Sequence, residues 1–264
     1  MPVNVSMLTS IKNNLPPLVA TVLFVAMICV NALANILPIN GLNTGQVSDL
    51  YPSLFTPSGI TFSIWSVIYL QLLGTVIVIW RNRSHRTIEK LLPLFSLSCI
   101  FNLSWIIVWH YLMPVLSVLI MLCLLTVLII AFRMLHREKK LSTRINILIK
   151  VPMTIYLAWI SVATIANVAA MFISFNWKGG FLSEQNWTVI MIIIATLLAI
   201  FITTKFNAPF FTLVVMWAVL GIYLRWRDTL YTDIIYCSMI CMGLMLVALV
   251  YFIRQRVVNL SKRQ

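Results

Sequence analysis

Long runs of apolar residues dominate the sequence, and short polar segments separate them. A helix of about 20 apolar residues spans the hydrocarbon core of a bilayer. The pattern predicts eight transmembrane helices, over residues 17–37, 59–80, 91–112, 114–134, 147–174, 187–204, 208–225 and 232–253. Seven spans are the alternative, because the sixth run is short. Only Met113 and Pro114 separate the third run from the fourth, and proline favours the first turn of a helix, so we predict a tight helical hairpin there.

The basic residues gather in alternate polar segments. When the N-terminus is placed in the cytoplasm, 16 of the 19 Lys and Arg fall on the cytoplasmic side, and Lys178, Arg225 and Arg227 fall outside. Because Lys and Arg favour cytoplasmic loops, we predict eight spans with both termini cytoplasmic.

The longest outer segment, residues 38–58, has several Pro and Gly residues and is too irregular to cross lipid alone. Large apolar side chains lie in its second half: Leu50, Tyr51, Leu54 and Phe55. Two interpretations stay open, a lid over the mouth of the helical bundle and an ordinary loop at headgroup level. Five tryptophans are interpreted as interfacial anchors: Trp80, Trp177, Trp187, Trp217 and Trp226.

Composition excludes several classes of protein. The chain has 264 residues, of which 61% are hydrophobic and 9% charged, whereas soluble domains carry about 25% charged residues. This excludes a soluble enzyme, a secreted disulfide scaffold and a disordered tail. A net charge of +13 in a soluble protein would suggest nucleic acid. Here we attribute the charge to membrane orientation and anionic headgroups, and we expect the lipid bilayer and no nucleic acid as partner.

The predicted membrane interior lacks ionisable residues suited to catalysis. No Asp or Glu lies in the interior of a span, since Asp233 stands at the very start of the last one, so proton coupling through carboxylates and intramembrane proteolysis are not expected. The five cysteines form no CxxC pair, so we expect no metal site and no disulfide framework. His110, at the outer end of the third span, is a single candidate ligand, which is not enough to predict haem binding. We therefore expect a non-enzymatic protein without a cofactor.

Neutral polar and aromatic residues recur at helical spacing within four spans. The stripes are Asn31 and Asn35; Trp65 and Tyr69; Ser98, Asn102, Trp105 and Trp109; and Tyr156, Trp159, Ala163 and Asn167. Residues three or four apart share a helix face, and Asn is costly in hydrocarbon, so these faces should turn inward. Two interpretations compete: hydrogen bonds and packing between helices, or a cavity for a flat apolar ligand.

Three of these segments resemble motifs of the tryptophan-rich sensory protein family (TspO, also called the translocator or peripheral benzodiazepine receptor family). Residues 57–69, PSGITFSIWSVIY, resemble the family's PPGWxFGPVWTxLY; residues 102–105 resemble LNxxW; and residues 156–167 resemble YLxWxxFATxLN. Ser63 and Ile64 replace the family's Gly-Pro, and Val162 replaces its Phe. The resemblance covers residues 17–175 of a divergent, longer member.

The resemblance implies a fold and a domain organisation. We expect an all-α integral membrane protein with a TspO-like five-helix bundle (17–175, outer loop 38–58) and a three-helix C-terminal extension (176–253). A cytoplasmic segment (1–16) and a basic tail (254–264) flank them. The family also implies a bacterial inner membrane.

The resemblance further implies a pocket between the helices for tetrapyrroles or sterol-like lipids. Its expected ligand-binding residues are Phe62, Trp65, Tyr69, Asn102, Trp105, Tyr156, Trp159, Ala163 and Asn167. The protein would act as a carrier, sensor or regulator; the alternative is a transporter of an uncharged or lipid-like solute that uses all eight helices. The small residues Ala163, Ala166 and Ala170 suit either a homodimer or packing within one chain.

Overall fold

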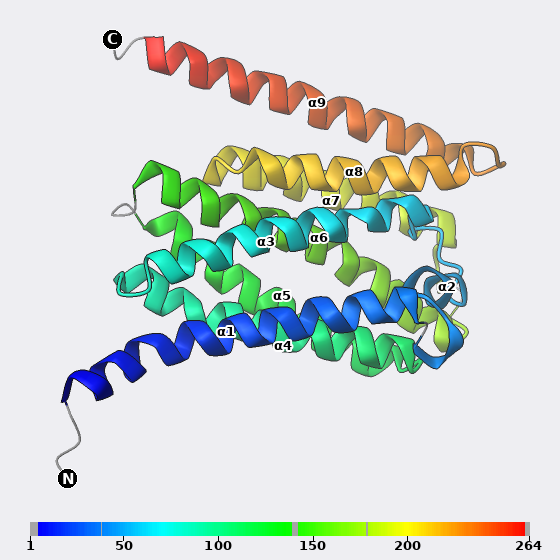
Figure 1. The fold of residues 1–264 in the computed structure, drawn as a ribbon. Helices are drawn as coiled ribbons and strands as arrows, with labels where there is room; N and C mark the ends of the chain where they lie inside the picture. The colour runs from blue at the N-terminus through cyan, green and yellow to red at the C-terminus, as the bar shows by residue number, and fades with distance from the viewer. Residues whose placement is uncertain (1–4, 38, 139–141, 178, 262–264) are drawn as a thin grey trace. The chain divides into compact units, whose positions relative to one another are not determined.

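The chain is almost entirely helical. The computed structural model describes residues 5–37, 39–138, 142–177 and 179–261. Its elements are α1 (Val5–Ile36), η1 (Ile39–Gly41), α2 (Thr44–Asp49), η2 (Gly59–Ser63), α3 (Ile64–Arg81), α4 (Arg86–His110), α5 (Pro114–Arg137), α6 (Thr143–Ser174), α7 (Glu184–Phe206), α8 (Pro209–Trp226) and α9 (Thr232–Ser261) (Figure 1). Within these ranges, eight helices are long and apolar enough to cross a membrane and no strand occurs, which confirms the predicted fold class and the eight spans.

α4 and α7 begin before their predicted apolar runs, and a polar side chain caps the start of each. α4 begins at Arg86, before the predicted 91, and the His85 side chain accepts a hydrogen bond from Thr87 N at 3.2 Å. Between α4 and α5, Leu112 has a left-handed φ of 56° and Pro114 occupies the first turn of α5. The predicted hairpin at Met113-Pro114 is confirmed. α1 begins at Val5, so the described part of the predicted N-terminal segment is helical.

The outer loop is more ordered than its Pro and Gly content predicts. η1, α2 and η2 lie in or next to it. At the start of α2, Asn43 N donates to Gln46 Oε1 at 2.8 Å and Gln46 N donates to Asn43 Oδ1 at 2.9 Å. This reciprocal arrangement is a capping box. The prediction missed α2 because a helix of six residues has no apolar run of its own.

The chain divides into two compact units. Unit 1 comprises residues 1–47 and 65–157, and unit 2 comprises residues 48–64 and 158–264. In unit 1, α4 packs against both α1 and α5. The Phe24 and Phe95 rings lie 6.0 Å apart, and both side chains are buried. In unit 2, α7, α8 and α9 each pack against the other two (Figure 1).

A threonine pair joins α7 to α8 inside unit 2. The Thr203 and Thr212 hydroxyls lie 2.7 Å apart, and Thr212 Oγ1 also donates to Ala199 O at 2.9 Å. Both side chains are buried, and such hydrogen bonds stabilise helix pairs in lipid.

Some basic residues used to predict orientation lie outside the described residues: Lys139, Lys140, Lys178, Lys262 and Arg263. The side chain of Lys12 is likewise not described. The orientation of the termini stays a prediction.

Candidate ligand-binding site

Five of the nine expected ligand-binding residues lie in unit 1, where they touch one another. The Trp65 ring stacks on Tyr69 at 5.5 Å, and its centroid lies 6.1 Å from Trp105 and 6.2 Å from Tyr156. Tyr156 has no exposed surface. The stripes on α3, α4 and α6 therefore turn inward, as their polarity predicts.

Asn102 is the polar centre of this cluster. Its Oδ1 accepts from Asn31 Nδ2 at 2.9 Å, and its Nδ2 donates to Tyr156 OH at 3.0 Å. The three side chains connect α1, α4 and α6, and all are buried. These contacts are the interhelical hydrogen bonds of the first interpretation. They do not test whether the same residues also contact a ligand.

The other four expected residues lie in unit 2. The Phe62 and Trp159 rings meet edge to face at 6.1 Å. Asn167 Nδ2 donates to Ala163 O at 3.0 Å, so this carbonyl already has a partner from its own helix. Their ligand-binding role also stays a prediction.

Unit 2 contains an apolar cavity of about 570 Å³, a volume within the range of small-molecule sites. α6, α7, the α6–α7 loop and the end of the outer loop supply its walls. The residues that line it are Ser53, Phe55, Thr164, Ile165, Val168, Ala169, Phe172, Ile173, Trp177, Gly179, Glu184, Trp187, Thr188 and Met191. None of the nine expected residues is among them. Thr164 and Val168 are sequence neighbours of Ala163 and Asn167 on α6.

Aromatic side chains concentrate at one end of the cavity. The Phe172 and Trp177 rings lie 4.7 Å apart, and the Trp177 and Trp187 rings 5.9 Å apart. Trp187 Nε1 donates to Gly179 O at 2.8 Å, which fixes the indole against the α6–α7 loop. The sequence predicts interfacial anchors at both tryptophans, and in the structure both line the cavity. In the sequence, the signal that could have located this cavity is the pair of tryptophans on either side of Gly179 and Gly180.

Polar groups in the cavity wall are few. Glu184 is the only charged residue among the described lining residues. Its Oε1 accepts from Leu54 N at 3.1 Å, which ties α7 to the outer loop. The Thr164 and Thr188 hydroxyls donate to Ile160 O and Glu184 O within their own helices. A few placed polar groups on an apolar wall are typical of a small-molecule site.

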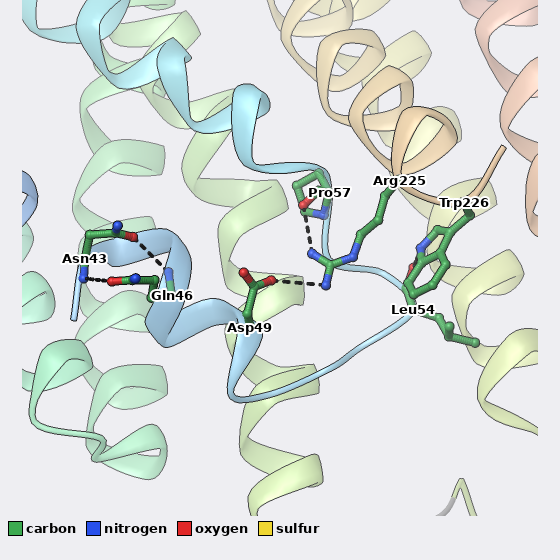
Figure 2. Close-up of polar contacts among 7 residues, drawn as sticks. All are labelled: Asn43, Gln46, Asp49, Leu54, Pro57, Arg225 and Trp226. Atoms are coloured by element: carbon green, nitrogen blue, oxygen red, sulfur yellow. Dashed lines mark hydrogen bonds and ion pairs between the residues drawn. The ribbon is translucent and has the colours of Figure 1, made fainter. Parts of the chain in front are cut away.

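α8 holds the outer-loop segment 49–61 in place. Trp226 Nε1 donates to Leu54 O at 2.9 Å, and Arg225 reaches Pro57 O at 3.4 Å and Asp49 Oδ1 at 3.1 Å (Figure 2). Farther along, Ser58 N donates to Gly221 O at 3.0 Å, and Trp217 Nε1 donates to Thr61 O at 3.0 Å. Because most of these acceptors are backbone carbonyls, the hydrogen bonds fix the path of the loop's main chain. That course brings Ser53 and Phe55 to the cavity wall, and the choice between a lid and an ordinary loop stays open.

The start of the outer loop is held separately, within unit 1. His110 is fully buried at the end of α4, with Nε2 3.1 Å from Thr44 Oγ1 and Nδ1 3.2 Å from Ile39 O. Both ring nitrogens therefore contact protein atoms. Farther along the loop, in unit 2, partial burial raises the pKa of the Tyr51 hydroxyl above its ordinary value.

The sequence profile of a family described as TSPO-like protein matches residues 17–251. The chain belongs to the TSPO-like protein family. The match confirms the resemblance and continues beyond residue 175, over α7, α8 and most of α9. Comparison with curated proteins and with solved structures finds no significant match.

Membership of the TSPO-like family, together with eight membrane-spanning helices, fits a multi-pass membrane protein that binds or transports a ligand. The lipid bilayer is its environment. Among the described residues of this TSPO-like chain, no group of three or more His, Cys, Asp and Glu is placed to hold a metal ion.

Proposed function

We propose that this TSPO-like protein binds a hydrophobic, flat small molecule in the cavity of unit 2 and acts as a carrier, sensor or regulator. The observation that carries the proposal is the cavity itself: about 570 Å³, with aromatic walls and few polar groups. Trp177, Trp187 and Phe172 would stack on the ligand, and Phe55 would close over it from the outer loop.

The wall chemistry favours one of the two expected ligand classes. A tetrapyrrole carries acidic propionates, and the charged group among the described lining residues is the carboxylate of Glu184. A neutral sterol- or lipid-like molecule avoids this repulsion. Its hydroxyl would donate to Glu184 or to a threonine. We therefore propose a sterol- or lipid-like ligand ahead of a tetrapyrrole.

The nine residues implied by the family resemblance remain a separate proposal for the ligand contacts. In unit 1 the rings of Trp65, Tyr69 and Trp105 would stack on a ligand. In unit 2 Trp159 and Phe62 would do the same. Binding measurements distinguish these positions from the cavity, because the two sets share no residue.

The test is binding of a fluorescent sterol and of protoporphyrin to the purified full chain, followed by anisotropy. Ala169 lines the cavity, so Ala169→Phe should fill part of it and weaken sterol binding at least tenfold. Ala32 is exposed on α1, so Ala32→Phe adds the same ring outside the cavity and should leave binding unchanged. If Trp105→Phe or Trp159→Phe weakens binding and Ala169→Phe does not, the ligand binds at the residues implied by the family resemblance and not in the cavity. The absence of saturable binding of either probe would contradict the proposal.

The second candidate is a transporter of an uncharged or lipid-like solute. The family match over residues 17–251 favours it, because the match includes helices beyond a five-helix bundle. Counterflow of a labelled sterol in liposomes tests it. Saturable exchange that Ala169→Phe abolishes would support transport, and binding without exchange would leave the sensor or carrier.

We further propose that both termini are cytoplasmic, that the membrane is a bacterial inner membrane and that the protein is not an enzyme. The positive-inside distribution supports the orientation. The family resemblance supports the location and the lack of catalysis. A homodimer through the small-residue face of α6 stays a proposal that cross-linking would test.

A further inference from the structure

A second pocket lies in unit 1, where the beginning of α4 meets the end of α5. Its volume is about 460 Å³, and Lys90 from α4 and Arg133 and Arg137 from α5 line it. Arg133 and Arg137 are four residues apart, so they share one face of α5. The Thr87 hydroxyl donates to Glu138 Oε2 at 2.8 Å, which holds the two helix ends together at the pocket.

The charges of this pocket do not balance. Three basic side chains and one carboxylate, that of Glu138, line it. Within the described part of the chain, no acidic side chain lies within salt-bridge distance of Lys90, Arg133 or Arg137. Like charges gathered in one place repel unless an anion lies between them. The pocket therefore has the electrostatics of an anion site.

Helix dipoles explain only part of this cluster. Arg133 and Arg137 lie in the last turns of α5, where the negative end of the dipole favours cations. Lys90 lies in the second turn of α4, where the dipole disfavours a positive charge. Lys90, Arg133 and Arg137 are all exposed, so an anion can reach the three side chains from outside the protein.

Apolar side chains extend the pocket toward the membrane. Ile130 and Met134 line it on α5. Ile130 lies about one turn farther into the span than Arg133 and is half exposed, whereas Met134 lies between the two arginines along the helix. A ligand that fits both parts has a phosphate at the basic end and a hydrocarbon chain along Ile130. Basic pockets between transmembrane helices bind lipid headgroups in this way.

We propose that this pocket binds the phosphate of an anionic phospholipid, held by Lys90, Arg133 and Arg137. The inference is independent of the proposed function, because the pocket lies in unit 1 and shares no residue with the cavity of unit 2.

The test is native mass spectrometry of the full chain in detergent, titrated with phosphatidylglycerol or with phosphatidylcholine. The wild type should bind phosphatidylglycerol in preference. Each lost charge should weaken binding about fivefold, so Lys90→Gln/Arg133→Gln/Arg137→Gln should weaken it about 100-fold. The control Lys205→Gln/Arg254→Gln/Arg256→Gln removes the same charges from other helix ends and should bind as the wild type does.

Inorganic phosphate distinguishes the two sources of the phosphate group. If millimolar phosphate leaves phosphatidylglycerol bound, the contact of the lipid's hydrocarbon chain with Ile130 contributes to binding, and the ligand is a lipid. If phosphate displaces the lipid, the site takes free phosphate compounds. Equal losses in the pocket and control variants, or no loss in either, would overturn the proposal. Arg133→Lys/Arg137→Lys keeps the charges and should retain binding, which separates a charge effect from misfolding.

Discussion

At the scale of single residues, buried amides determine how the helices of unit 1 meet. Asn102 contacts Asn31 on α1 and Tyr156 on α6 through hydrogen bonds of 2.9 and 3.0 Å. An unpaired amide in hydrocarbon costs free energy. The hydrogen bonds of Asn102 therefore favour one rotation of α1 and of α6 relative to α4. Asn35, by contrast, is exposed and donates to Asn31 O on its own helix.

Asn102→Leu should therefore lower the stability of the protein by about 1–2 kcal/mol, because it removes two hydrogen bonds between helices. The matched Asn35→Leu should change stability by a few tenths of a kcal/mol at most. Thermal unfolding in detergent, followed by intrinsic fluorescence, compares the two. Equal midpoints for both variants would show that the Asn102 contacts do not stabilise the bundle.

At the scale of elements, the close approach of the outer loop to α8 depends on Gly221. A Cβ atom at this position would overlap the Thr61 side chain and lie 2.9 Å from Pro57 Cβ. The Ser58 N to Gly221 O hydrogen bond lies at the same place. The exposed Asp49–Arg225 ion pair contributes less, because surface pairs are worth about 0–1 kcal/mol.

Gly221→Ala should displace the loop from α8 and destabilise the protein by about 1–3 kcal/mol through overpacking. A methyl group added at Gly243 on α9 would meet no atom within 4 Å, so Gly243→Ala should be neutral or slightly stabilising. Limited proteolysis within residues 49–58 and thermal unfolding measure both effects. Loop cleavage that is no faster in Gly221→Ala than in Gly243→Ala would contradict a fixed loop.

The eight spans could be predicted because a bilayer demands long apolar runs, and the hairpin because Pro114 starts a helix. The beginning of α4 could not be predicted, because the His85 cap lets the helix start within a polar segment. The cavity could not be found either. Trp177 and Trp187 lie at span ends, a position typical of anchors, and only the folded loop brings Phe55 beside them. Tertiary contacts, rather than periodicity, form that cavity.

At the scale of the whole molecule, basic residues are predicted on both sides of the membrane, with 16 on the cytoplasmic side and three outside. Arg225 pairs with Asp49, and Arg227 with Asp228 at 3.2 Å. Two of the three basic residues predicted on the outer side therefore have acidic partners, and the third, Lys178, lies outside the described residues. The unbalanced basic residues Lys90, Arg133 and Arg137 lie on the predicted cytoplasmic side.

The orientation yields a direct prediction for reporter fusions. A reporter active only in the cytoplasm should be active at both ends of the chain. A reporter active only outside should be active when inserted at residue 180, in the predicted outer loop. Activity of the outer reporter at either terminus would show that the number or direction of the spans differs from the prediction.

The central claim is that the cavity of unit 2 holds an apolar ligand, and native mass spectrometry of the purified protein tests it most directly. We predict a retained sterol- or lipid-like molecule in the wild type and in Ala32→Phe, and its loss in Ala169→Phe. Retention of the same molecule in all three proteins would contradict a ligand in this cavity.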